Sequence, residues 1–308
     1  MMLSSRHLSI GLCALALLAS AACTPAEQKI AKKFDAAIAK CKGTQETFAE
    51  LTLSHGEKRK VLRSACALPI SKVKMTDAFH GEATMGPYTL RAGQEDKTGI
   101  WVLASIDWEP MSTALSELDA QDRDEASFTR VVTALGEAEK GMPDEPWIKV
   151  TRFENMLAIR KRERAKATDT SLGKETEGYY ASIIKWAGDK SQPAVAQKVR
   201  LMVVDYYNAY KQFLGQNLEA GDSDERLKTA IQHAENKEQA AKYQAELDKL
   251  VKSREAAAKA AQEKIAEIQK RLCAEAPLLS EKGIEDKDLK VRISATQSGI
   301  KCDTQPGQ

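Results

Sequence analysis

Helical periodicity dominates the hydrophobic pattern of the chain from Ser112 onward. Apolar residues recur there at steps of three and four, as they do on the buried stripe of an amphipathic helix. The longest stripe follows Pro193 and comprises Val195, Val199, Met202, Val203, Tyr206, Tyr210, Phe213 and Leu214. Shorter stripes end at Gly136, follow Pro146 and end at Gly188. The pattern predicts a helical domain over residues 111–221.

A last, long helix is predicted over residues 222–275. Asp222 with Glu225 is a capping-box pattern, which is typical of a helix start. Farther along, positions separated alternately by four and three residues form the seam expected of a coiled coil. Those positions are Leu247, Val251, Arg254, Ala258, Ala261, Ile265, Ile268 and Leu272. The upstream stripe runs in another phase, which predicts a bend between residues 238 and 244. The pattern does not decide whether the seam packs within the chain or pairs with a second chain.

Strict alternation of apolar and polar residues marks residues 71–110. One run extends from Ile100 to Trp108 and another from Tyr88 to Ala92, and a turn at residues 96–99 joins them. This pattern predicts a β-hairpin. A third strand around Val73 is expected, because an isolated two-stranded hairpin is only marginally stable in water.

The remaining segments lie at the two ends of the chain. Residues 23–70 predict a tether and a helical hairpin, whose second helix opens at a capping box over residues 54–57 and runs to Cys66. The tail, residues 276–308, has an alternation at Leu289, Val291 and Ile293 that suggests a short strand. The expected fold is mostly α with a small β-hairpin or three-stranded sheet (α+β). It is a helical bundle with a long C-terminal coiled-coil-like helix.

Residues 1–22 have the layout of a secretory signal peptide. Arg6 is their one charge, residues 8–18 are an apolar stretch, and residues 19–22 are small. At 1.5 Å per residue the apolar stretch would reach roughly 16 Å as a helix, against roughly 30 Å for the hydrocarbon core of a membrane. It is therefore too short to serve as a spanning anchor.

The segment from Leu18 to Cys23, Leu-Ala-Ser-Ala-Ala-Cys, resembles the lipobox of bacterial lipoproteins. Its Ser20 stands where Leu is usual in that motif, and residues 20–22 also suit an ordinary signal peptidase. The resemblance implies lipidation of Cys23, which would become the new N-terminus, and attachment to a membrane through that lipid. Thr24, in a position where Asp often marks retention in the inner membrane, implies the outer membrane. The body would then face the periplasm or the cell surface.

Cysteine usage fits an oxidising compartment. Removal of the leader and lipidation of Cys23 would leave four thiols, Cys41, Cys66, Cys273 and Cys302, which allow three pairings. Local pairs are favoured, Cys41 with Cys66 and Cys273 with Cys302, each worth roughly 3 to 3.5 kcal/mol in the chain-entropy model. A metal site built from Cys41, Cys66 and the histidines His55 and His80 is the alternative. It lacks the spacings of known zinc motifs.

Composition excludes several functional classes. A chain of 308 residues that is 43% hydrophobic can build a core, and its formal charge of +2 does not indicate binding to nucleic acid. The sequence lacks the nucleophile elbow, the Walker A loop, the HExxH motif and the dinucleotide fingerprint. We therefore assign no catalytic residue, cofactor or metal from the sequence.

Two features are candidates for binding. Trp101, Trp108, Tyr206 and Tyr210 are the candidates for lining a ligand groove, and Tyr179 and Tyr207 are the tyrosines expected to face a groove. The alternative is that these aromatic residues belong to the hydrophobic core, which is the more common role of such stripes. Residues 149–166 carry seven basic residues against two acidic, and residues 109–145 carry ten acidic against three basic. These runs either complement helix dipoles or form a surface for a charged partner.

The sequence therefore predicts a lipid-anchored cell-envelope lipoprotein, acting as a non-enzymatic structural or protein-interaction module with an envelope protein as its partner. The alternatives are a periplasm-facing lipoprotein that binds a small ligand and, less favoured, an enzyme with an unrecognised site.

Overall fold

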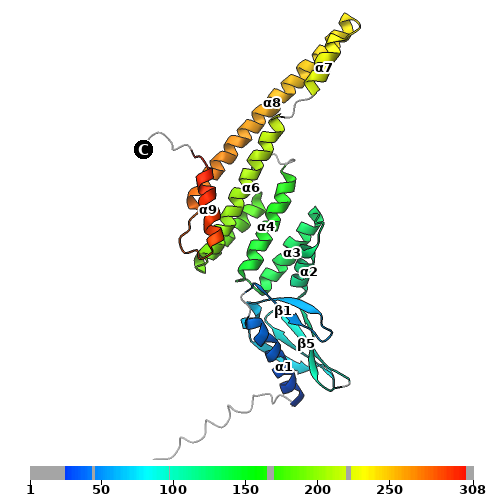
Figure 1. Cartoon of the computed structure of the whole chain (residues 1–308), viewed down its shortest axis with the longest axis vertical. Coiled ribbons are helices and arrows are strands. Elements are labelled where there is room, and N and C mark those ends of the chain that lie inside the picture. Colours follow the sequence, from blue (N-terminus) through cyan, green and yellow to red (C-terminus); the bar gives the residue numbers. More distant parts are fainter. Residues whose placement is uncertain (1–24, 44–45, 97, 165–169, 220–222, 303–308) are drawn as a thin grey trace, which may run out of the picture. The chain divides into compact units, whose positions relative to one another are not determined.

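The computed structural model describes residues 25–43, 46–96, 98–164, 170–219 and 223–302 (Figure 1). The chain divides into two compact units, residues 1–112 and 113–308. The described part is mostly helical and carries two small antiparallel sheets, so the predicted α+β class with a dominant helical content is confirmed. None of the described helices combines the length and the hydropathy needed to cross a bilayer.

The described part of the first unit is made of helix α1, strands β1 to β6 and the start of α2, Glu109–Asp119. Their bounds are α1 Pro25–Lys42, β1 Phe48–Thr52, β2 Lys58–Leu62, the 3-10 turn η1 Ala65–Ala67, β3 Ile70–Met75, β4 His80–Met85, β5 Tyr88–Gln94 and β6 Trp101–Asp107. Strands β1 and β2 form one sheet, and β3 to β6 form a four-stranded meander in chain order. The predicted hairpin is therefore the β5–β6 pair, and two further strands extend its sheet.

Helix α1 supplies the core of the first unit. It packs against β1, β3 and β6. Ile30, Phe34 and Cys41 are fully buried at the helical spacing read from the sequence. A Cβ built on Gly81 of β4 would overlap the end of the Ile30 side chain. The absence of a side chain at Gly81 therefore allows α1 to pack closely against the sheet. The other face of the meander is polar, and there Arg91 forms an ion pair with Asp107 at 2.9 Å.

The predicted second helix over residues 54–66 is wrong, because this segment forms the turn of the β1–β2 hairpin, strand β2 and the start of the 3-10 turn η1. The residues read as a capping box form its turn, in which the Leu53 amide donates to the Glu57 carbonyl at 2.7 Å and Gly56 takes a φ of +78°. A positive φ suits glycine and does not occur inside a helix. Val61 and Leu62, adjacent in sequence, are both fully buried at the end of β2.

The second unit is helical. Its elements are α2 Glu109–Asp119, within which the division between the units falls, α3 Glu125–Gly141, α4 Pro146–Glu163, α5 Lys174–Asp189, α6 Pro193–Glu219, α7 Ser223–Gln232, α8 Lys237–Glu275, the 3-10 turn η2 Ala276–Leu278 and α9 Lys287–Gly299. Helix α3 continues five residues past Gly136, where the sequence predicted its end. Asp124 caps its start by accepting from the Ser127 amide at 2.7 Å, so this acidic residue has a capping role.

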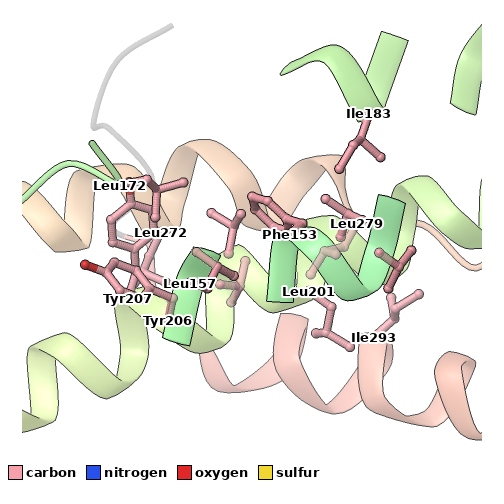
Figure 2. Packing of buried hydrophobic residues seen from close by; sticks show 14 of the residues in the cluster. Phe153, Leu157, Leu172, Ile183, Leu201, Tyr206, Tyr207, Leu272, Leu279 and Ile293 are labelled. Carbon is pink, nitrogen blue, oxygen red and sulfur yellow. The ribbon is translucent and has the colours of Figure 1, made fainter. Parts of the chain in front are cut away.

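Side chains from α4, α5, α6, α8 and α9 share the core of the second unit. Figure 2 shows Phe153 and Leu157 of α4 close to Leu201 of α6, Leu272 of α8 and Ile293 of α9. All five are buried. Helices far apart in sequence thus close around one apolar centre.

The long C-terminal helix is divided in two. Residues 233–236 separate α7 from α8, and Asn236 caps α8 by accepting from the Gln239 amide at 2.8 Å. The break therefore lies before the bend predicted at residues 238–244. Asn236 sets its position, because Asn is a favoured N-cap residue and so marks the start of a new helix. Helix α8 packs against both α7 and α6. Leu247, Ile268 and Leu272 of the predicted seam are buried.

The tail forms a helix, and the predicted strand at residues 289–293 is wrong. Leu289 and Ile293, four residues apart, are buried in α9, whereas Val291 is 68% exposed. Leu289 and Ile293 are separated by one helical step of four residues, and the apolar Val291 between them made the pattern resemble the alternation of a strand. Cys302 follows α9 and pairs with Cys273 of α8.

Candidate functional site

The aromatic residues proposed as a groove belong to two separate hydrophobic cores. Trp101 and Trp108 are buried in the first unit, where Trp108 packs edge-on against Tyr88 with ring centroids 5.1 Å apart. Tyr206 and Tyr210 are buried in the second unit. None of the four is more than 9% exposed, so packing already surrounds them. The prediction that they line an open groove is therefore wrong.

Tyr207 and Tyr179 were expected to face a groove. Tyr207 is buried, and its ring lies edge-on to Tyr206. Tyr179 is half-buried and lines a different cavity, which is described below. Tyr179 therefore lines a cavity within the described part of the chain.

The basic run at residues 149–166 does not form one surface. Lys149 and Arg152 both contact Glu139. Arg162 lies over the ring of Phe128 and Arg164 over the ring of Phe213, with 4.8 Å and 4.6 Å to the centroids. The charges are therefore dispersed over several internal contacts, and Lys166 lies outside the described residues.

The predicted cysteine pairs are both formed. Cys41 and Cys66 are bonded within the first unit, and Cys273 and Cys302 within the second. The alternative metal site is excluded for Cys41 and Cys66 because their sulfurs are bonded to each other. Among the described residues no group of three His, Cys, Asp or Glu side chains is placed to hold a metal ion. The predicted lipidation site, Cys23, lies outside the described residues.

A groove on the second unit is the best candidate for a functional site. It consists of two cavities, of about 430 Å³ and 580 Å³, between α3, α4 and the first turns of α5. Both are lined by Val132, Thr133 and Glu175, so they are neighbouring parts of one groove. We refer to the larger part as the Tyr179 cavity and to the smaller part as the Thr176 cavity, after residues that line each.

A cluster of charged and aromatic groups forms one wall of the Tyr179 cavity. The Glu139 carboxylate accepts from Lys149 Nζ, from Arg152 Nη1 at 2.9 Å and from the Tyr179 hydroxyl at 2.8 Å. Arg152 also lies over the Tyr179 ring, 4.5 Å from its centroid. Lys149 lies over the ring of Trp186 at 5.1 Å. The cluster links α3, α4 and α5 through a single carboxylate.

Local structure explains how these groups meet. The short connection between α3 and α4 brings Glu139 beside Lys149, and the next helical turn of α4 adds Arg152. A Cβ built on Gly136 would lie 3.2 Å from Arg152 Cζ, so this glycine leaves room for the guanidinium against α3. Lys149 is 8% exposed, which is unusual for a lysine and requires a partner charge.

The contacts shift the ionisation of the cluster. Burial raises the pKa of Glu139, but the hydrogen bonds from Lys149, Tyr179 and Arg152 and the charge of Lys149 outweigh it and hold the pKa below its ordinary value of 4.5. Burial and the hydrogen bond to the Glu139 carboxylate both raise the pKa of Tyr179. At neutral pH the cluster therefore carries an ionised Glu139 and a protonated Tyr179.

The Thr176 cavity lies at the start of α5. Gly173 is the N-cap residue, has a φ of +83° and provides no side-chain cap. Thr176, three residues on, lines the cavity and is 8% exposed. Arg160 of α4 also lines it, and its Nε donates to the Ser171 carbonyl at 3.2 Å. Met156 and Leu172 provide apolar surface.

This groove can bind polar and apolar groups side by side. Its lining combines hydroxyl groups, ionised side chains of both signs and aliphatic surface. Sequence reasoning missed it, although the run Trp147-Ile148-Lys149-Val150 contains a signal. A lysine within an apolar stretch predicts a buried charge that needs a partner.

Comparison of this chain with known protein families, with curated proteins and with solved structures gives no match.

Proposed function

We propose that this chain is a lipid-anchored cell-envelope lipoprotein that acts as a non-enzymatic protein-interaction module. The anchor would be acylated Cys23, with the body in the periplasm or at the cell surface and the outer membrane favoured. A membrane and an envelope protein would be its partners, the latter contacted through the groove between α3, α4 and α5.

The pairing of the other cysteines is the observation that supports lipidation of Cys23. Cys41, Cys66, Cys273 and Cys302 are bonded in two pairs. Cys13 lies within the leader, so Cys23 is the cysteine that remains once the leader is removed. A cysteine after four small residues suits lipidation, and several acyl chains on one residue bind a membrane stably.

The mixed lining of the groove supports a protein partner. A groove with aliphatic surface and polar groups of both signs suits a polypeptide, which presents both kinds of group. The buried cluster around Glu139 holds one wall in place, which limits the side-chain ordering needed on binding.

The seam of α8 supports a further structural element of this module. Leu247, Ile268 and Leu272 are buried where α8 packs against α6 and α7. We propose that α8 forms an antiparallel coiled coil with these two helices. The buried positions of the seam would then be satisfied within the chain, whereas Val251 of the seam is 37% exposed.

The anchor has a direct test. Mature protein from cells producing the natural chain is expected to begin at Cys23 and to carry diacylglyceryl and acyl groups by intact mass. It should partition into detergent, whereas the Cys23→Ala variant should remain in the aqueous phase. Cys13→Ala is the matched control and should behave as the natural chain. A natural product with an unmodified Cys23 would contradict the proposal.

The contact surface is tested by photocrosslinking in cells. A benzoylphenylalanine at Thr133, which lines both cavities, is expected to capture a specific envelope protein that mass spectrometry can identify. The same group at Ala181, exposed on α5 and not part of either lining, is the control. Binding should then be reproduced with both proteins purified. Equal capture from both positions, or none from Thr133, would contradict the proposed surface.

A further inference from the structure

One end of the four-stranded sheet exposes two large apolar side chains. Phe79 is 60% exposed and Ile100 is 57% exposed. Phe79 lies between β3 and β4, and Ile100 lies between β5 and β6. Their carbonyls accept from the consecutive amides of Gln94, at 2.9 Å, and Glu95, at 3.0 Å. The two residues therefore belong to neighbouring turns at the same end of the sheet, and we refer to them together as the apolar tip.

Phe79 continues the buried face of β4 beyond its cover. Gly81, Ala83 and Met85 are buried residues of β4, and residues two apart share one face of a strand. Phe79 holds the next position of this series but is exposed. Single exposed apolar residues are common on protein surfaces, so the position of the tip relative to the rest of the unit decides what it can contact.

Helix α1 starts at the same end of the unit as the apolar tip. Near its start, Ile30 packs against Gly81, which lies two residues from Phe79. At its other end, Cys41 is bonded to Cys66, four residues before the start of β3. Strand β3 is antiparallel to β4 and therefore begins at the end of the sheet away from the tip. Helix α1 thus runs from the tip towards the opposite end (Figure 1).

Chain length places the proposed lipid beside this end. Pro25, the first residue of α1, is five residues before Ile30, or roughly 7 Å along a helix. Phe79 is about the same distance from Gly81 along a strand. The start of α1 and Phe79 therefore lie at a similar level. Cys23 is two residues before Pro25, and two residues span at most about 7 Å. Acyl chains on Cys23 would enter a membrane next to the apolar tip.

We propose that the apolar tip docks on the membrane surface into which the acyl chains of Cys23 insert. The side chains of Phe79 and Ile100 would lie in the boundary between lipid headgroups and acyl chains. Apolar side chains gain free energy there in proportion to the area that they bury. This inference rests on the proposed anchor and deepens it, because it names the surface of the unit that contacts the lipid.

Charge indicates which lipids suit the tip. Asp77 and Glu95 are exposed in the two turns, and Lys29 is exposed near the start of α1. The Asp77 carboxylate accepts from the Phe79 amide at 2.7 Å and pairs with His80 at 2.8 Å. Charges of both signs at one end do not select a lipid of net charge, so the docking uses apolar contact and suits zwitterionic phospholipid.

The test uses the chain from Cys23 to Gln308 with one synthetic acyl chain. Its other cysteines are bonded in pairs, so Cys23 provides the free thiol for a maleimide that carries a single myristoyl-length chain. One such chain gives only marginal, reversible membrane binding, which makes an added contact measurable. Partition into phosphatidylcholine vesicles, measured by sedimentation, is expected to be at least tenfold stronger for this protein than for its Phe79→Ser plus Ile100→Ser variant.

Val251→Ser plus Val291→Ser is the matched control. These valines are exposed on α8 and α9, so this variant loses apolar side chains elsewhere and should partition as the unsubstituted protein does. Phe79→Leu plus Ile100→Val keeps the tip apolar and should retain binding. Vesicles that also contain phosphatidylglycerol should give the same ratio between the unsubstituted protein and the serine variant of the tip. Circular dichroism checks that each variant is folded.

Hydrogen exchange tests the docking without a substitution. The acylated protein is compared on vesicles and in buffer by mass spectrometry. Amides of residues 76–80 and 98–100 are expected to exchange severalfold more slowly on vesicles, because the turns that carry the tip would be shielded from water. The turn at residues 86–87 joins β4 to β5 at the opposite end of the sheet, and its exchange should not change.

Several results would overturn the proposal. Equal partition of the unsubstituted protein and the serine variant of the tip would exclude docking, as would unchanged exchange in both turns. A dimer in buffer that the serine substitutions abolish would assign the tip to a second copy of the chain. A difference seen only with vesicles that contain envelope proteins would assign it to a protein partner.

Failure of the docking and failure of the anchor are distinguishable. The acyl chain is attached chemically in these measurements, so they do not depend on lipidation in the cell. An unmodified Cys23 in the natural product would contradict the anchor and leave the partition results unchanged. Equal partition would contradict the docking alone.

Discussion

Glu139→Ala is expected to lower the free energy of unfolding of the second unit by about 3–5 kcal/mol. The substitution removes the carboxylate that Lys149 and Arg152 share and leaves a buried lysine and a partly buried arginine without it. Tyr179 also loses its hydrogen-bond acceptor. Urea unfolding followed by circular dichroism and by tryptophan fluorescence measures the loss, and Trp186 reports on the cluster because it lies against Lys149.

Glu137→Ala is the matched control. Glu137 also lies on α3 and pairs with Lys140 at 2.7 Å, but both side chains are more than half exposed. An exposed pair of this kind is worth at most about 1 kcal/mol. Similar losses in the two variants would show that the buried cluster does not stabilise the unit.

The same comparison has a defined pH dependence. Because the fold holds the pKa of Glu139 below its ordinary value of 4.5, the ionised carboxylate stabilises the fold fully above that value. This contribution is lost as the pH falls through the lowered pKa. The stability difference between the natural chain and Glu139→Ala should therefore be constant near neutrality and shrink in acid below pH 4.5.

Loss of the Cys41–Cys66 bond is expected to have the second large effect. Replacing both cysteines by alanine should destabilise the first unit by about 3–4 kcal/mol, because the bond closes a loop with a sequence separation of 25. In a small unit this is a large part of the total stability. Urea unfolding followed by circular dichroism, with Cys273→Ala plus Cys302→Ala as the control, assigns the loss to its unit.

The two bonds should also differ in their reactivity. Both sulfurs of the Cys41–Cys66 pair are in fully buried residues, whereas Cys302 is exposed. Dithiothreitol under native conditions is therefore expected to open Cys273–Cys302 first, because thiolate attack requires access to a sulfur. Alkylation and peptide mass mapping give the order. Simultaneous opening in buffer would contradict it, whereas simultaneous opening in urea is expected.

Sequence pattern predicted the helices with long apolar stripes and failed where the stripe was short. The stripe after Pro193 and the start at Pro146 correspond to α6 and α4, because many periodic positions outweigh local exceptions. At residues 54–57 a capping box and a hairpin turn share the same residue types. Gly56 favours the turn, because it adopts the positive φ that the turn requires. At residues 289–293 three apolar residues were too few to distinguish a period of two from a step of four.

The candidate site was less predictable than the fold. The sequence left two roles open for the aromatic residues, a ligand groove or the core, and Tyr206 and Tyr210 fill the core, because large apolar groups gain most from burial. The apolar neighbours of Lys149 mark it in the sequence, but its partner Glu139 is identified only once α3 and α4 lie side by side. Thr176 is one of many threonines in the sequence, and its place beside a cavity depends on how α3, α4 and α5 pack, which no local pattern encodes.

Lysine placement on the outer strands has a consequence for how the first unit behaves at high concentration. Strands β2 and β3 are two of the four edge strands of the described sheets, and an open edge invites pairing with another chain. Lys58, Arg59 and Lys60 are exposed along β2, while β3 carries an irregularity between Ser71 and Lys74. Cationic side chains and a broken register both oppose edge-to-edge growth into aggregates. The edges formed by β2 and β3 are therefore protected against such growth even when the chain is concentrated.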